Sequence, residues 1–399
     1  RVDIVAFFQA VDRVVPLDAV HCLIKEGVHP LLARLYAARG IQSVDDIGGS
    51  LKDLAPPSAL KGVDIAAGLL ADAIEADQCF LIVGDYDCDG ATATAVAVQI
   101  LRALNARVDF LIPNRLAHGY GLSPDVVSLV RAAKPDWVIT VDNGISDVAG
   151  VAAMREAGIH VLVTDHHLPA EVLPPADAIV NPNQPGCNFP SKALAGVGVI
   201  FYVMMQLRAA LRERGFFTHR KEPNLACYLD LVALGTVADM VPLDRNNRIL
   251  VAEGLKRVRA GLARPGIQAL LTIAGRDPGF AVVEDFGYFV APRLNAAGRL
   301  GDMALGVECL AAEDPVTAQA AAHRLDKLNR KRQSIQQGML NAADGLLQRR
   351  FTPSSETIAL FDSAWHEGVI GIVAGKLKEQ EQKPVFVFAA GQDGILKGS

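Results

Sequence analysis

Residues 79–104 read CFLIVGDYDCDGATATAVAVQILRAL: an apolar run, then three carboxylates, then a second apolar stretch. The first run is typical of a buried strand and the second of a helix. Asp85, Asp87 and Asp89 stand between them at alternate positions. An extended backbone would point all three carboxylates to one side, where they would repel one another. Either they spread into water or a cation lies among them.

The same alternation of apolar runs and helical stretches continues along the chain. Short apolar runs predict further strands, and residues 147–158 predict a further helix. Strands that alternate with helices of this length indicate βαβ units. We therefore predict an α/β fold with a parallel sheet flanked by helices on both faces. The further strands are expected at residues 106–113, 136–141, 159–164 and 177–182.

Metal-binding types of residue follow these predicted strands. Asp142 and the Asp-His-His triplet 165–167 directly follow two of them. In parallel sheets, ligands bind beyond the carboxyl ends of the strands. Asp239 lies in an apolar helical run, where a carboxylate is rarely buried unless it is paired or bound to a metal. We expect these groups to meet at one edge of the sheet.

Each signal also has an ordinary interpretation. Asp142 opens an Asp-Asn-Gly sequence that is typical of a turn, and adjacent histidines on a loop are often polar surface. Their coincidence at successive strand ends favours a shared site. Carboxylates and imidazole without thiolate suit Mn²⁺ or Mg²⁺ better than structural zinc. The ligands exceed what one ion needs, so we expect two ions.

Composition sets wider limits. The 399 residues are 51% hydrophobic and 21% charged, which allows a large core, and the net charge is −5. That charge is weak evidence against nucleic acid, because metal-binding carboxylates raise the count of acids. The longest uncharged apolar run, residues 193–205, is shorter than the ~20 residues of a membrane span. Six scattered cysteines, with no Cys-x-x-Cys pair and no leader, favour a reduced, cytoplasmic protein.

Seven motifs, in order along the chain, resemble the DHH phosphoesterase superfamily and, within it, the RecJ family of bacterial single-stranded-DNA exonucleases. The second and the last motif distinguish RecJ from other DHH proteins. The motifs are GDYDCDGAT (84–92), NRLAHGYGLS (114–123), TVDNGIS (140–146), VTDHHLP (163–169), NPNQPGCNFPSKALAGVGV (181–199), DLVALGTVADMVPLD (230–244) and APRLNAAGRL (291–300).

The resemblance implies two metal sites and three catalytic residues. Asp142 would bridge both ions, and Asp89, His166 and Asp239 would complete one site. His167 would face the scissile phosphate and stabilise the charge that develops in the transition state. The implied catalytic residues are Asp142, His166 and His167. The implied ligands of the two Mn²⁺ or Mg²⁺ ions, with Asp85 as a neighbour or further ligand, are Asp85, Asp87, Asp89, Asp142, His166 and Asp239.

The resemblance also implies substrate phosphate contacts. Arg115 would anchor the terminal 5′-phosphate, which suits a planar guanidinium. Arg293, Asn295 and Arg299 would line the groove, with a structural role as the alternative. Ser399, after Gly398, would be the serine of a Gly-Ser-x-Arg-Ser stretch that clamps phosphate in the family, and the carry-over stops there because this sequence does not include the arginine. The basic run 324–332, RLDKLNRKR, would either follow a DNA backbone or form a solvated helix face.

Four segments follow from the pattern and the resemblance. We expect an N-terminal helical segment (1–60), a DHH catalytic domain (61–312), a long connecting helix (313–351) and the start of a DHHA1 domain (352–399). The motif WHEGVIG, residues 365–371, resembles the beginning of that last α/β domain. The chain starts at Arg1 and stops at Ser399, so we expect a fragment of a longer protein in which this second domain is cut off.

The implied function is a metal-dependent 5′→3′ exonuclease that degrades single-stranded DNA to 5′-mononucleotides in recombination and repair. The implied partners are single-stranded DNA, a single-strand-binding protein and a helicase, with no membrane. One alternative is a DHH-family oligoribonuclease or cyclic-dinucleotide phosphodiesterase. Another is a non-catalytic replisome scaffold, against which the intact set of acids and histidines argues.

Overall fold

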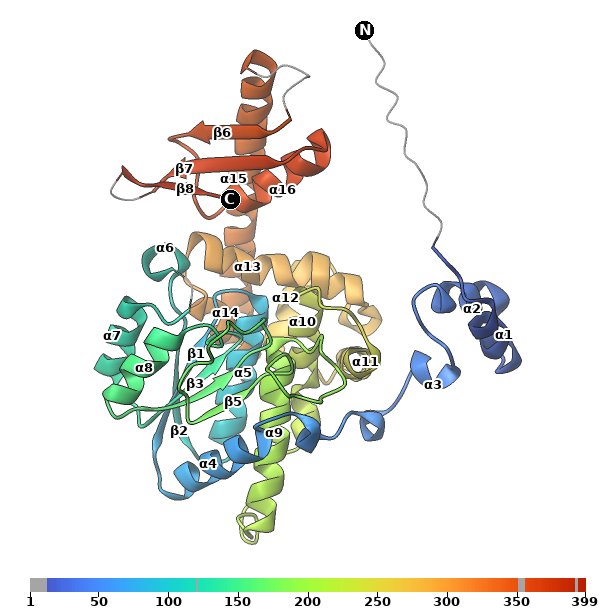
Figure 1. The fold of residues 1–399 in the computed structure, drawn as a ribbon, viewed down its shortest axis with the longest axis vertical. Coiled ribbons are helices and arrows are strands. Elements are labelled where there is room, and N and C mark those ends of the chain that lie inside the picture. The colour runs from blue at the N-terminus through green and yellow to red at the C-terminus, as the bar shows by residue number, and fades with distance from the viewer. Residues whose placement is uncertain (1–12, 120, 351–355, 392–393) are drawn as a thin grey trace.

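Five strands pair in one parallel sheet of order β2-β1-β3-β4-β5 (Figure 1). The computed structural model describes residues 13–119, 121–350, 356–391 and 394–399. The predicted α/β class with a parallel sheet is confirmed. The first twelve residues of the predicted N-terminal segment and residues 352–355 of the last one lie outside the described part. The strands are β1 (Cys79–Gly84), β2 (Arg107–Leu111), β3 (Trp137–Val141), β4 (His160–Thr164) and β5 (Ala178–Val180).

Helices cover both faces of this sheet because its side chains alternate between two cores. Phe80 and Ile82 of β1 lie in the larger core, whereas Leu81 and Val83 lie in the smaller one. The larger core is packed against α4 (Val63–Glu75), α5 (Cys88–Ala103), α9 (Gly196–Glu213) and α10 (Leu229–Ala238). The smaller core is packed against α7 (Pro124–Ala133) and α8 (Val148–Glu156).

The strand order places a binding position at the carboxyl ends of β1 and β3. After β1, the chain forms β2 on one side of β1 and then crosses to form β3 on the other side. The connections therefore diverge between β1 and β3, which is where parallel α/β sheets bind ligands. Asp85 directly follows β1, and Asp142 directly follows β3.

The expectation of three aspartates on one extended strand is wrong. The strand ends at Gly84, and α5 begins at Cys88. Asp87 is the N-cap of this helix, and its Oδ1 accepts a hydrogen bond from the Gly90 amide at 3.0 Å. Asp89 lies in the first helical turn. A strand-to-helix turn therefore spreads the three carboxylates, which an extended segment would have aligned.

The second half of the large domain is helical. A π-helix (Asp285–Val290) leads directly into α13, and α13 contacts both α5 and the long helix α15. The predicted long helix is confirmed, since α15 runs from Pro315 to Arg350. The other elements are α6 (Arg115–His118), η3 (Leu225–Tyr228), α11 (Arg245–Arg259), α12 (Pro265–Ile273), η4 (Pro278–Phe280), α13 (Ala291–Leu300) and α14 (Ala304–Ala311).

Two smaller units flank the large domain (Figure 1). Helix α15 joins its core to that of a small α/β unit, because Leu325 is buried in the first and Met339 in the second. Within the described residues, every helix is too short or too polar to cross a membrane. The small unit holds β6 (Ile358–Asp362), α16 (Ile370–Glu381), β7 (Val385–Ala390) and β8 (Leu396–Gly398), and the N-terminal unit holds α1 (Leu17–Lys25), α2 (Pro30–Ala37) and α3 (Val44–Ile47). The short 3-10 helices η1 (Leu51–Asp53) and η2 (Pro57–Ala59) follow it and contact α11 and α9 of the large domain.

Candidate metal centre

All six predicted metal ligands converge at the carboxyl edge of the sheet. Three overlapping groups each bring one possible ligand atom per residue within 4.8 Å of the others. Asp142 belongs to two of these groups and His166 to two, as a bridging arrangement requires. The groups are Asp85 with Asp87 and Asp142, Asp89 with His166 and Asp239, and Asp142 with His166 and His167.

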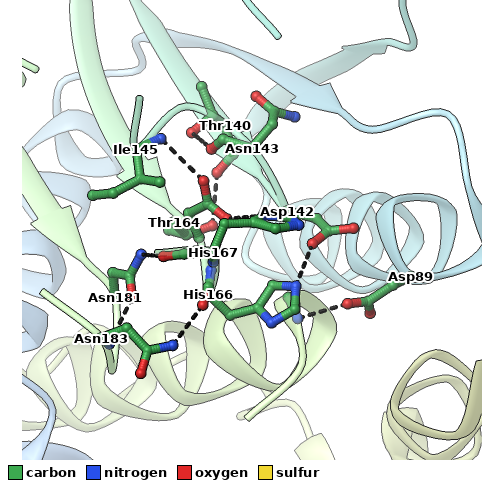
Figure 2. Close-up of polar contacts among 12 residues, drawn as sticks. Asp89, Thr140, Asp142, Asn143, Ile145, Thr164, His166, His167, Asn181 and Asn183 are labelled. Carbon is green, nitrogen blue, oxygen red and sulfur yellow. Dashed lines mark hydrogen bonds and ion pairs between the residues drawn. The ribbon is translucent and has the colours of Figure 1, made fainter. Parts of the chain in front are cut away.

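Asp142 and His166 form the centre of this cluster. The Nε2 of His166 lies 3.0 Å from Oδ1 of Asp142 and 3.6 Å from Oδ2 of Asp239. Figure 2 shows the imidazole of His166 directed toward Asp142 and Asp89. Oδ1 of Asp142 and Nε2 of His166 are buried and make no hydrogen bond within the described part of the chain. Buried polar atoms are almost always satisfied, so this pair fits a divalent cation between them.

Backbone conformation fixes the position of Asp142. Its φ angle is 63°, a left-handed conformation that aspartate adopts more readily than most residues. The first residue of α9, Gly196, packs against its carboxylate, and a Cβ at Gly196 would lie only 2.6 Å from Oδ1 of Asp142. Glycine is therefore needed at this position for the carboxylate to reach the centre of the cluster.

Asp89 is held by the N-terminus of α9. Its carboxylate accepts hydrogen bonds from the amides of Gly196 at 2.6 Å and Val197 at 3.0 Å. These amides and the positive end of the helix dipole favour the ionised carboxylate. Burial and, to a smaller extent, repulsion from Asp87 disfavour the ionised form. The net effect raises the pKa of Asp89 to about 7. Burial is therefore the stronger effect at this site.

The other carboxyl groups of the cluster are affected in the same way. Burial, with repulsion from neighbouring aspartates, raises the pKa of Asp85 and of Asp239 to about 7, and that of Asp142 well above its ordinary value. Burial lowers the pKa of His166, which favours the neutral imidazole that binds metals. Such a cluster resists collecting negative charge unless a cation offsets it. A divalent cation would supply the positive charge that these carboxylates need in order to be ionised together.

Asp165 orients both histidines. Its buried carboxylate accepts hydrogen bonds from the backbone amides of His166 at 2.7 Å and Ile145 at 3.0 Å, and Nδ1 of His167 lies 2.7 Å from Oδ1. That contact raises the pKa of His167 to about 9. Asn181 and Asn183 donate to the carbonyl oxygens of the two histidines (Figure 2). Asp165 therefore acts as a positioning residue: it fixes the backbone at His166 and, through Nδ1, the imidazole ring of His167.

We expect Asp165→Asn to lower kcat of the metal-dependent phosphodiester hydrolysis that the family resemblance implies about 10- to 100-fold, with KM changed little. The amide group cannot accept all the hydrogen bonds that the carboxylate accepts, so the ring of His167 and the backbone at His166 lose their fixed orientation. Steady-state kinetics would measure the change. Asp177→Asn is the control, since Asp177 pairs with His160 at 3.0 Å but at the other end of β4. A variant with wild-type kcat would refute the positioning role.

A group of arginines lies next to the cluster. Burial lowers the pKa of Arg299, and the nearby guanidinium groups of Arg115 and Arg332 lower it further. Arg115 packs over the ring of Tyr86, 5.0 Å from its centroid. Arg115 and Arg332 each lie close enough to Arg299 to repel its charge, and a bound anion would offset that repulsion. Of the predicted phosphate contacts, Arg115 and Arg299 are thus brought together, and Arg332 joins them.

The remaining predicted phosphate contacts lie in structural positions. Arg293 forms an ion pair with Asp326 of α15 at 3.0 Å and donates to the Phe289 carbonyl at 2.6 Å, which supports the structural alternative for it. Oδ1 of Asn295 accepts from the Cys88 amide at 2.7 Å and so fixes α13 to the start of α5. The backbone of Ser399 exchanges hydrogen bonds with Val387 in the small sheet.

Three contributions to the site were missed from the sequence. Asp165 was recognised as part of the Asp-His-His triplet, but its role in holding the rings depends on turn geometry. Gly196 stands in a glycine-containing motif before a helix, a pattern that could have indicated close approach. Arg332 lies in a basic run whose other lysines and arginines are exposed, and no pattern in the sequence distinguishes it from them.

Comparison with known proteins agrees with the geometry. The model of the DHH family N-terminal domain matches residues 79–236, which include β1 to β5 and helix α10 up to Thr236. A parallel sheet that carries aspartates and an Asp-His-His turn at its carboxyl edge defines a DHH-family α/β protein. The match ends three residues before Asp239, which completes the cluster.

Relatives identify the family more closely. The single-stranded-DNA-specific exonuclease RecJ of Salmonella typhimurium is 50% identical over 377 residues, or 93% of this chain. A crystal structure of exonuclease RecJ bound to manganese is 36% identical, with a TM-score of 0.73 over 83% of this chain and 80% of that one. The crystal structure of RecJ from Thermus thermophilus in complex with Mn²⁺ is 34% identical, with a TM-score of 0.78 over 94% of this chain and 52% of that one. The chain belongs to the RecJ family. It spans 65% of the length of the Salmonella protein.

Proposed function

We propose that this chain hydrolyses single-stranded DNA from its 5′ end, with two Mn²⁺ or Mg²⁺ ions held by Asp85, Asp87, Asp89, Asp142, His166 and Asp239. The observation that carries the proposal is the convergence of these residues around buried atoms of Asp142 and His166 that make no hydrogen bond within the described residues. Relatives that bind manganese and are named single-stranded-DNA-specific exonucleases support it.

In this proposal, separate residues hold the metal ions and stabilise the reacting phosphate. Asp142 and His166 hold the shared centre of the metal site, and the α9 amides keep Asp89 in place beside them. The bound ions supply Lewis acidity and lower the pKa of water. Nε2 of His167 can donate to a phosphoryl oxygen only while the imidazole is protonated, because Nδ1–H already donates to Asp165. Protonated, it can stabilise negative charge on the phosphoryl oxygens.

The arginine group would set the direction of the reaction. Arg115, Arg299 and Arg332 offer guanidinium groups for a terminal phosphate, which carries more negative charge than an internal phosphodiester. An anchor of this kind beside the metal ions would align the first phosphodiester bond of a 5′-phosphorylated strand for cleavage. The family resemblance further supports work in the cytoplasm alongside a helicase and a single-strand-binding protein.

The decisive experiment follows one long single strand labelled at either end. We expect 5′-mononucleotides to be released from the 5′ end in Mn²⁺ or Mg²⁺, and none in the presence of a chelator. Activity that survives the chelator would remove the proposal. Equal loss of label from the 3′ end would remove only the polarity. Similar rates on dinucleotides and on long strands would favour a small-substrate hydrolase, and metal binding without turnover would favour a scaffold.

Arg299→Ala is expected to raise KM for a 5′-phosphorylated strand about tenfold or more, because a charge-assisted contact is lost. The same strand with a 5′-hydroxyl should show little change. Arg330→Ala is the matched control, since Arg330 lies on the exposed side of α15 and pairs with Asp326 at 2.8 Å. An equal effect on both strands would show that Arg299 supports the fold through its bond to the Gly368 carbonyl instead.

A further inference from the structure

A cavity of about 300 Å³ lies at the end of α10, and one of its lining residues is the sequence neighbour of a predicted metal ligand. Its lining comes from the end of α10 with the loop that follows, and from the π-helix with the residues before it. Met240, which lines it, directly follows the cluster residue Asp239. The cavity and the metal cluster therefore both take residues from the carboxyl end of α10.

Two large apolar side chains at this cavity are exposed to solvent. Tyr288 is 75% exposed and Met240 is 87% exposed. Met240 also has a φ angle of 59°, a left-handed conformation that a residue with an unbranched apolar side chain rarely adopts. Tyr288 lies on a π-helix, a rare element that is frequent at functional sites. Exposed apolar groups gathered at a cavity indicate a binding surface.

The lining suits a flat ring better than a phosphate. The nine residues that line the cavity include no lysine, arginine or histidine. The hydroxyl of Thr236, also part of the lining, is buried and makes no hydrogen bond within the described residues. Glu284 adds an exposed carboxylate that can accept hydrogen bonds from amino groups of a base.

We propose that this cavity binds a nucleobase of the single strand, with Tyr288 stacking on the ring and Met240 covering its edge. Aromatic side chains bind bases of single strands by stacking, which tolerates any sequence. The arginine group beside the cluster would hold phosphate while the cavity holds a base. This inference rests on the proposed function, because it assumes that single-stranded DNA is the substrate.

The test combines a protein variant with an abasic substrate. Tyr288→Ala in the full chain should raise KM for a single-stranded oligonucleotide about fivefold or more, with kcat little changed. Tyr288→Phe, which keeps the ring, should behave as wild type. A single abasic residue is then moved along the first nucleotides of the strand. At one position the abasic residue should raise the KM of the wild type as much as Tyr288→Ala does. On the strand that is abasic at this position, the KM of the variant should rise no further.

Phe280→Ala is the matched control, because Phe280 is 80% exposed and lies outside the cavity lining. Its KM should equal that of the wild type. An unchanged KM for Tyr288→Ala would overturn the inference, as would a loss that persists on every abasic strand. Such results would point to an apolar group of a protein partner in the cavity. A wild type that releases no nucleotide would overturn the proposed function as well, so that measurement comes first.

Discussion

Asp142→Asn is expected to lower metal-dependent release of nucleotides by about 100-fold or more, and to leave the metal-free protein at least as stable as the wild type at pH 8. Loss of an outer partner of a metal ligand already costs about 10- to 100-fold, and Asp142 lies in two of the three ligand groups. Asparagine keeps the volume of the side chain and removes its charge. It also tolerates the left-handed backbone at this position, where alanine would add strain.

The expected gain in stability has a separate cause. Burial and the neighbouring aspartates raise the pKa of Asp142 well above its ordinary value, so ionising it in the metal-free protein is unfavourable. The amide removes that cost. Initial rates and thermal unfolding in chelator would measure both effects. Asp136→Asn is the control, because Asp136 accepts from the Cys79 amide at 2.7 Å at the opposite end of β3. An active Asp142→Asn protein would refute the bridging role.

Much of this site could be predicted because strand ends are visible in the sequence. The runs that end at Gly84, Val141 and Thr164 are apolar and short, and the parallel arrangement brings their carboxyl ends to one edge. Asp239 was harder to place from spacing alone, because it ends a helix of the other half of the domain. Its apolar surroundings were the signal, since an isolated carboxylate there needs a partner.

The rest depended on contacts that leave no periodic signal. Extended alternation was the wrong geometry for residues 85–89, because the hydrogen bond from Gly90 to Asp87 starts a helix there. The pairing of Arg293 with Asp326 joins residues on separate helices. Exposed Tyr288 and Met240 could not be distinguished from core residues, because apolar side chains in helical sequence usually face inward.

A second large effect should couple metal binding to protons. The raised pKa values of Asp85, Asp89 and Asp239, each about 7, compare with about 4 for an exposed carboxyl group. Between these two pH values the folded, metal-free protein binds more protons than the unfolded chain. Its stability therefore falls as the pH rises from about 4 to about 7. A divalent ion replaces those protons, so its apparent affinity should rise across the same window and level off above it.

Thermal unfolding with Mn²⁺ and with chelator at several pH values would measure this coupling. We expect Mn²⁺ to raise Tm little at pH 5 and by several degrees at pH 8, since a ligand at 100 times its Kd adds about 2.7 kcal/mol. The raised pKa of His167 stabilises the folded protein at low pH, and this contribution is lost as the pH rises from about 6.5 to about 9. Comparing the two conditions at each pH removes background titrations that metal does not change. A gain in Tm that is independent of pH would show that Mn²⁺ binds elsewhere. If Mn²⁺ no longer raises the Tm of Asp142→Asn, the ion binds among these carboxylates.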